Sequence, residues 1–302
     1  GYSIFAIFGL IVLYNRLVIA QGHEKVSKTQ AVNFWHFVWP IAVAVGLGWG
    51  QTQSYRFLME SSLGLYQLGL FAAGFGISAG LISAFDSIFS TYLQPIFYKN
   101  ISSGNRLEKS DAWNRYAEIY FPSLLLVGLL TGALAAELTR LLLGPEFQES
   151  YRFVVWGAIA EIARISLSVF ALVPHATKKT SLLVLPNLVG ALAVISMIFI
   201  LTPILGTIGV GLAPSVGSIL ALMSMVLAVK GELILKLPTA KILQSILMGL
   251  SLLLLSFVLQ EVLGEKPDIK FVLLKLFCLG TVFLCFEYLL LRSLFSRPYK
   301  YE

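Results

Sequence analysis

Residues 180–229 read TSLLVLPNLVGALAVISMIFILTPILGTIGVGLAPSVGSILALMSMVLAV, without a single charged side chain. A helix needs about 20 apolar residues to cross a bilayer, so this stretch is long enough for two crossings. Near its middle, the residues from Thr202 to Gly206 include the proline and glycine that are typical of a turn. The sequence therefore predicts two membrane-spanning helices here, at 181–201 and 207–229.

The composition of the whole chain favours the same environment. Of the 302 residues, 57% are hydrophobic and 13% are charged, and the mean hydropathy is +0.83. Soluble proteins carry about 25% charged residues, so lipid is the natural solvent for so apolar a surface. No run shows the alternation of a transmembrane barrel strand. We therefore predict an all-α, polytopic bundle of transmembrane helices.

Apolar runs bounded by charged or turn-forming residues divide the chain into about nine predicted spans. They are 2–20, 34–55, 63–97, 116–138, 152–174, 181–201, 207–229, 242–260 and 271–291.

The basic residues alternate between the loops on the two sides of these spans. Fifteen of the 22 Lys and Arg residues fall on one side, namely Arg16, Lys25, Lys28, Lys99, Arg106, Lys109, Arg115, Lys178, Lys179, Lys230, Lys236, Lys241, Arg292, Arg297 and Lys300. Six fall on the other, namely Arg56, Arg140, Arg152, Lys266, Lys270 and Lys275. Cytoplasmic loops are the more basic ones, so we predict a cytoplasmic C-terminus. The net charge of +6 then needs no nucleic-acid partner.

Motifs of nucleotide, metal and nucleophile chemistry are missing from the sequence. It has no Walker loop and no GxGxxG, HExxH, GxSxG or CxxC pattern. Cys278 and Cys285 lie in one apolar run, too far apart along a helix to bond each other. We expect no cofactor, no metal, no catalytic residues and no enzymatic activity.

Three segments together resemble one family of transporters. They are GLYQLGLFAAGFGISAGLISAFDSIFSTYLQPIFYKNI at 64–101, LLLGPEFQES at 141–150 and GTIGVGLAPSVGS at 206–218. In order and spacing they resemble the polysaccharide transporter branch, of the O-antigen flippase type, in the multidrug/oligosaccharidyl-lipid/polysaccharide flippase superfamily. Each motif is weak alone, and the resemblance is spread over nearly the whole chain.

The resemblance implies a fold with two six-helix lobes. Residues 1–33 would then be the last helix of an N-terminal lobe, cut short at its start, followed by a cytoplasmic linker at 21–33. Residues 34–230 would be the C-terminal lobe, and residues 231–302 an additional two-helix hairpin with a cytoplasmic tail. On this interpretation the chain is a fragment of a longer protein.

The resemblance also implies an activity. Such proteins move an undecaprenyl-diphosphate-linked oligosaccharide, a unit of O-antigen, capsule or exopolysaccharide, across the bacterial inner membrane by alternating access. Expected partners are this lipid-linked oligosaccharide, membrane lipids, a glycan polymerase and other assembly proteins. Three alternatives stay open: a drug or small-molecule exporter of the same fold, a membrane glycan polymerase or transferase, and a scaffold without transport activity.

Ionisable groups inside the predicted spans are the first candidates for a binding site. Glu161 and Arg164 lie three residues apart in the middle of 152–174, so they share one helix face. They are either a mutually neutralising structural pair or part of a substrate site. In the second case Arg164 would bind the diphosphate, because the guanidinium fork matches phosphate oxygens.

Asp86 lies in the inner half of the span 63–97. It is a candidate coupling site for a proton or sodium ion. The alternative is a helix-packing hydrogen bond to Ser83, Ser87 or Ser90.

Polar side chains also gather near the outer end of the span 34–55. Gln51, Gln53 and Arg56 are candidates for binding sugar hydroxyls, or else residues of the membrane interface. We expect Glu137, Glu287 and His175 near interfaces as well.

Overall fold

The computed structural model describes residue 12 and residues 28–101, 105–263 and 269–295, and within these ranges the regular structure is entirely helical. The chain divides into two compact units, residues 1–39 and residues 40–302. The predicted first span, 2–20, lies outside the described residues except for residue 12. So does the predicted linker up to residue 27, and its last residues, 28–33, are already helical.

The first long helix, α2 (Lys28–Ile101), contains two of the predicted spans, 34–55 and 63–97. It is broken at Gly64, whose φ of 81° and ψ of 169° are not helical. Only glycine adopts this backbone region without strain, because it has no Cβ. The break divides α2 into the two successive segments that the sequence predicts.

The other predicted spans correspond to helices with similar bounds. The elements are α3 (Arg106–Ala133), α4 (Ala135–Leu142), η1 (Pro145–Ser150), α5 (Tyr151–Thr177), η2 (Thr180–Leu183), α6 (Val184–Leu205), α7 (Thr207–Val229), α8 (Thr239–Leu263) and α9 (Ile269–Phe295). The predicted turn between α6 and α7 occurs at Gly206, which has a positive φ of 56°. The predicted span 116–138 is divided at Leu134 between α3 and α4.

Seven helices in the described part of the chain are long and apolar enough to cross a membrane, with α2 counted once. Their outward faces carry large apolar side chains, as on α8, where Leu247, Leu254 and Phe257 are each about 60% exposed or more. Water would penalise such faces, and lipid does not. The prediction of an all-α polytopic membrane bundle is confirmed.

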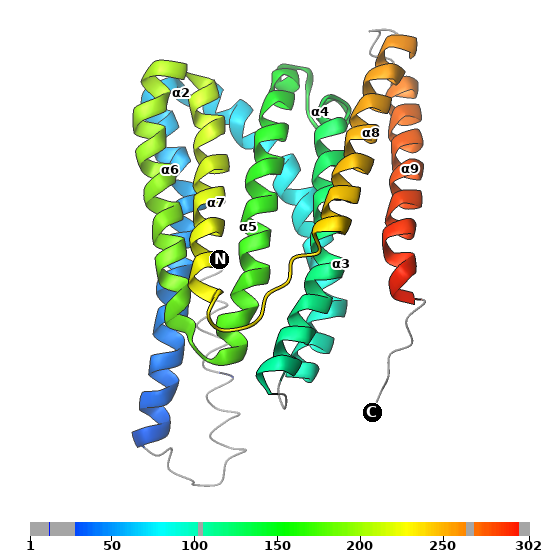
Figure 1. Ribbon diagram of the computed structural model, residues 1–302. Coiled ribbons are helices and arrows are strands. Elements are labelled where there is room, and N and C mark those ends of the chain that lie inside the picture. The colour runs from blue at the N-terminus through cyan, green and yellow to red at the C-terminus, as the bar shows by residue number, and fades with distance from the viewer. Residues whose placement is uncertain (1–11, 13–27, 102–104, 264–268, 296–302) are drawn as a thin grey trace. The chain divides into compact units, whose positions relative to one another are not determined.

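Within residues 40–302 the helices pack in a consistent order. α7 lies between α6 and α5, α5 lies beside α3, and α3 is covered by α8 and α9 (Figure 1). Small residues allow some of these approaches. A Cβ at Gly217 on α7 would come within 2.4 Å of Val194 on α6, and one at Gly74 on α2 within 2.2 Å of the Ser150 carbonyl oxygen. Backbones can approach this closely only where side chains are minimal.

The hairpin of α8 and α9 is joined to α3 and α4 by buried polar contacts. Lys275 Nζ on α9 lies 2.6 Å from Glu137 Oε1 on α4. Ser256 Oγ on α8 donates to the Ala133 carbonyl at 2.7 Å, and Ser123 Oγ on α3 donates to Glu287 Oε2 on α9 at 2.8 Å. Glu137 and Glu287 were expected near interfaces. That position in the membrane stays a prediction, and the structure adds that both carboxyls are buried and bonded to another helix.

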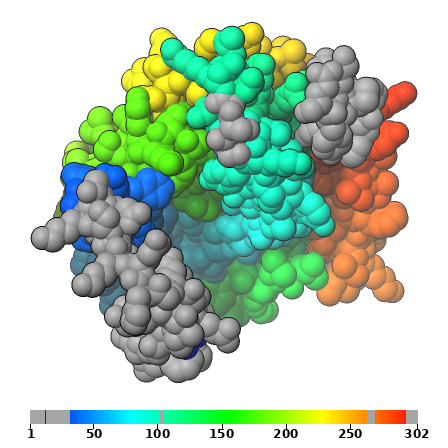
Figure 2. All heavy atoms as spheres, turned by 90° about the horizontal axis from the view of Figure 1, so that it is seen from below, coloured from blue at the N-terminus to red at the C-terminus, as the bar shows by residue number. Residues whose placement is uncertain are grey.

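The non-helical segment that joins α7 to α8, residues 230–238, follows one face of α3 (Figure 2). Residues spaced by four along α3 hold it. Arg106 donates to the Gly231 carbonyl, Ser110 Oγ accepts from the Ile234 amide, and Asn114 bonds both the Ile234 carbonyl and the Lys236 amide. The amide of Asn114 thus pairs with this backbone as a neighbouring strand would.

Candidate functional site

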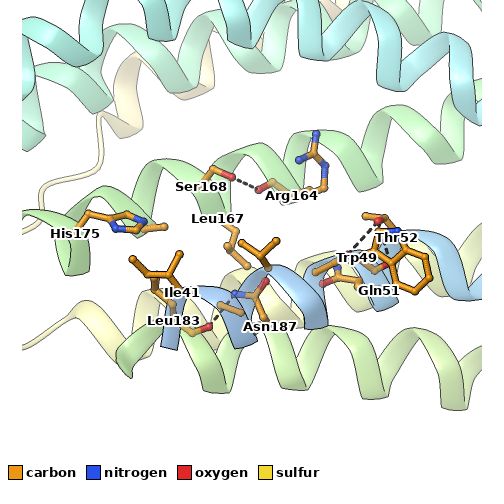
Figure 3. Close-up of a pocket in the computed structure, with 14 residues that line it drawn as sticks. Ile41, Trp49, Gln51, Thr52, Arg164, Leu167, Ser168, His175, Leu183 and Asn187 are labelled. Carbon is orange, nitrogen blue, oxygen red and sulfur yellow. Dashed lines mark hydrogen bonds between the residues drawn. The ribbon is translucent and has the colours of Figure 1, made fainter. Parts of the chain in front are cut away.

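A cavity of about 390 Å³ lies between the first part of α2, the second half of α5 and the start of α6 (Figure 3). This volume is within the range of small-molecule sites, roughly 300–1,000 Å³. The lining residues are Ile41, Ala44, Val45, Gly48, Trp49, Gln51, Thr52, Arg164, Leu167, Ser168, Ala171, His175, Leu183 and Asn187.

The α5 wall of the cavity follows from helical spacing. Arg164, Ser168, Ala171 and His175 are separated by four, three and four residues, so they form one face. From Arg164 to His175 this face extends roughly 16 Å, at 1.5 Å per residue. Among the described residues, Arg164 is the charged residue of the lining, and no acidic residue contributes to it.

Arg164 is bound to Glu161 by two contacts to the same carboxylate oxygen. Nε donates to Glu161 Oε2 at 2.9 Å and Nη2 at 2.5 Å. The Glu161 side chain is 5% exposed, whereas that of Arg164 is 36% exposed. Nη1 has no hydrogen-bond partner among the described residues. The pair is therefore both a structural unit and a source of free N–H donors.

The guanidinium of Arg164 lies between the cavity and the hydrogen-bonded pair of Asp86 and Tyr120. In Figure 3 it points away from Asn187 and the α6 wall. On its other side it interacts electrostatically with Asp86 on α2 and Tyr120 on α3. The Tyr120 hydroxyl donates to Asp86 Oδ1, and the Tyr120 ring stacks on Tyr116 with centroids 5.3 Å apart.

The hydrogen bond from Tyr120 bears on the predicted serine partners of Asp86. The partner of its carboxylate is Tyr120 on another helix, not Ser83, Ser87 or Ser90. Ser90 donates instead to the Ser87 carbonyl within α2. Asp86 therefore joins α2 to α3 and lies near Arg164.

Gln51 is the one of the three predicted polar residues on α2 that lines the cavity. It is buried, and its Nε2 donates to Ser218 Oγ on α7 at 3.0 Å. Its Oε1 lies against Gly190 on α6, where a Cβ would come within 2.4 Å. The carboxamide is thus held in place by both neighbouring helices.

Gln53 and Arg56 do not line this cavity. Arg56 is exposed, with its guanidinium 5.9 Å from the centroid of the Tyr55 ring. Helical geometry explains the separation, because residues two and five positions beyond Gln51 point to other faces of the same helix.

Several lining residues were not predicted. Trp49, Ser168, His175 and Asn187 belong to the cavity, and Tyr120 to the network beside it. The spacing of Ser168 and His175 from Arg164 was the available signal in the sequence. Asn187 and Tyr120 come from helices distant in sequence, and no local pattern could connect them.

Membrane-crossing helices that line a mainly apolar cavity with a few polar groups and an ion-paired arginine are typical of transporters and channels. No family model matches the chain, and no curated protein matches it in sequence. Among solved structures, the chain is similar to "Lipid II flippase MurJ, inward closed conformation", with a TM-score of 0.57 and 16% sequence identity. The match covers 96% of this chain and 61% of that one. The chain thus shares its helical fold with that structure and spans about three-fifths of the length of that protein.

Proposed function

We propose that the protein to which this chain belongs is a flippase for a lipid-linked oligosaccharide. The substrate would be an undecaprenyl-diphosphate-linked unit of O-antigen, capsule or exopolysaccharide, moved across the bacterial inner membrane by alternating access. The observation that carries the proposal is Arg164, a cationic side chain on the wall of a cavity to which the described part of the chain contributes no acidic lining residue. The fold shared with MurJ supports transport in place of enzymatic chemistry.

A diphosphate is the group that Arg164 suits best. An Arg in mid-membrane costs on the order of 3 kcal/mol even on the lenient insertion scale. Glu161 reduces this cost, and it uses Nε and Nη2 only. The N–H groups of Nη1 are left to bind phosphate oxygens, in the forked geometry for which Arg is preferred over Lys.

Groups suited to sugar lie on the same cavity. Asn187 and Ser168 offer amide and hydroxyl groups to sugar hydroxyls, and Trp49 offers an aromatic face. Gln51, whose Nε2 already donates to Ser218, would bind a sugar hydroxyl through its second N–H. Gln53 and Arg56, which lie elsewhere on α2, would contact substrate only at another stage of transport. Asp86, bonded to Tyr120 and within electrostatic reach of Arg164, is the proposed coupling site for a proton or sodium ion.

The domain organisation and location complete the proposal. Residues 34–230 would be the C-terminal six-helix lobe, 1–33 the end of the other lobe with its linker, and 231–302 the additional hairpin and tail. The C-terminus would be cytoplasmic, because its side carries most of the basic residues. A glycan polymerase and other assembly proteins would be partners.

A drug exporter of the same fold is the alternative. Cationic drugs require acidic cavities, and the acidic groups here, Glu161 and Asp86, are bonded to Arg164 and Tyr120. Of the Glu161–Arg164 ion pair it is Arg164 that lines the cavity, with its Nη1 donors unused among the described residues, and this favours the anionic lipid.

The test uses the full-length protein in cells whose surface glycan depends on it. Arg164→Ala should abolish glycan display, and Arg164→Lys should restore it only in part, because the fork is lost. Membrane-inserted protein is quantified in parallel. Normal display with Arg164→Ala would remove Arg164 from the mechanism. Loss of display together with loss of folded protein, equally in Glu161→Gln, would make the pair purely structural.

A further inference from the structure

A buried carboxyl outside the cavity, that of Glu287, lies in the seam between α3, α8 and α9. Glu287 is 9% exposed. Its Oε2 accepts a hydrogen bond from Ser123 Oγ at 2.8 Å, and its Oε1 has no partner among the described residues. The surrounding side chains of the seam are apolar and include Leu126, Leu252 and Phe286.

A second unpartnered polar atom lies at the same level of this seam. Ser245 on α8 is fully buried, and its Oγ has no hydrogen-bond partner in the described part of the chain. Its level follows from the contacts around it. Lys241 on α8 pairs with Glu118 on α3, and Ser256 bonds the Ala133 carbonyl, so the two helices run side by side in register. One turn beyond the Lys241–Glu118 pair, this register brings Ser245 level with Ser123.

No positive side chain among the described residues contacts Glu287. The nearby cations are already engaged: Lys241 with Glu118 at 3.0 Å, and Lys275 with Glu137 at 2.6 Å. Arg292, on the same helix, is exposed.

The other titratable groups on the helices packed around Glu287 are either bonded to other residues or exposed. Tyr120 on α3 donates to Asp86, and Tyr116 bonds Gln94. On α9, Tyr288 and Cys285 are exposed. An ionised Glu287 would thus be a buried charge with a single neutral hydrogen-bond donor, an arrangement that proteins avoid because its desolvation is not compensated.

We propose that Glu287 is a proton-binding site that controls how the α8–α9 hairpin packs on α3. With a proton bound, the carboxyl is neutral and fits the apolar seam. When the proton leaves, the unpaired charge favours separation of α9 from α3 and entry of water. A proton fits better than a metal ion, because hard metal cations take about six or more oxygen ligands. Ser123, Ser245 and Glu287 are the polar side chains that the seam supplies at this level. This site is independent of the flippase proposal.

The experiment is an infrared pH titration of the whole protein in lipid vesicles. A protonated carboxyl has a C=O stretch that a carboxylate lacks. We expect such a band at neutral pH that is lost in Glu287→Gln and shifted in Ser123→Ala, where the hydroxyl on Oε2 is missing. Glu232→Gln, at an exposed ion pair with Lys179, is the matched control and should leave the band unchanged.

Thermal unfolding gives a second readout. Wild-type protein should lose stability as the pH rises, because ionised Glu287 is not tolerated in the seam. Glu287→Gln, a mimic of the neutral form, should lose most of this dependence. An unchanged pH profile in Glu287→Gln would overturn the proposal. So would stabilisation of wild type, but not of Glu287→Gln, by sodium at fixed alkaline pH, which would indicate a metal site. If Glu287→Gln does not fold, an identical carboxyl band in wild type and Ser123→Ala overturns it.

Discussion

The ammonium group of Lys275 on α9 meets the carboxylate of Glu137 on α4 at 2.6 Å, with both side chains less than a tenth exposed. This ion pair fixes the last helix to the short α4. Removing one partner leaves the other as an unpaired buried charge, and such a loss typically costs about 3–5 kcal/mol.

Lys275→Met should therefore lower the free energy of unfolding by an amount in that range. The double variant Lys275→Met/Glu137→Leu should recover most of it, since neither charge remains. Denaturant unfolding in detergent, followed by tryptophan fluorescence, measures both. A double variant as unstable as the single one would contradict this account of the pair.

Gly74→Ala on α2 should destabilise the protein by about 1–3 kcal/mol, the usual cost of overpacking. The added Cβ would come within 2.2 Å of the Ser150 carbonyl oxygen, which is backbone and cannot rotate away. Gly76→Ala is the control, because a Cβ there meets nothing within 4 Å. The comparison is made by thermal unfolding, and equal effects of the two changes would show that α2 does not approach the end of η1 as described.

Asn114→Ala should loosen the segment 230–238. Two hydrogen bonds, to the Ile234 carbonyl at 3.0 Å and from the Lys236 amide at 2.7 Å, would be lost. Bonds of this kind contribute roughly 0.5–1.5 kcal/mol each, so the segment should lose about 1–3 kcal/mol of local stability. Hydrogen exchange of residues 230–238 should rise several-fold, while Leu107→Ala, an exposed change on the same helix, leaves it unchanged. Equal exchange in the two variants would mean that Asn114 does not hold the segment.

The topology can be tested with single cysteines in a variant lacking Cys278 and Cys285. Because of the asymmetry of basic residues, a membrane-impermeant thiol reagent added from outside should label a cysteine at 264–268. It should not label one at 99–110 until the membrane is permeabilised. The reverse labelling pattern would show that the chain has the opposite orientation in the membrane.

The sequence by itself determined the fold class and most helix positions. The uncharged stretch 180–229 predicted α6, α7 and the turn at Gly206, because the length and apolarity of a bilayer-crossing helix are local properties of the chain. The pairing of Glu161 with Arg164 was also readable locally, since residues three apart share a helix face.

Tertiary structure decided which polar groups meet. Gln51 reaches Ser218, Asp86 reaches Tyr120, and Lys275 reaches Glu137, and each pair joins helices far apart in sequence. A helical pattern reveals which face is apolar, but not which neighbour covers it. For the same reason Gln51 lines the cavity while Gln53 and Arg56 do not, and the carboxyl of Glu287 is buried between helices. The rotation and register of the packed helices, which depend on how their side chains fit together, determine which of these side chains are in contact.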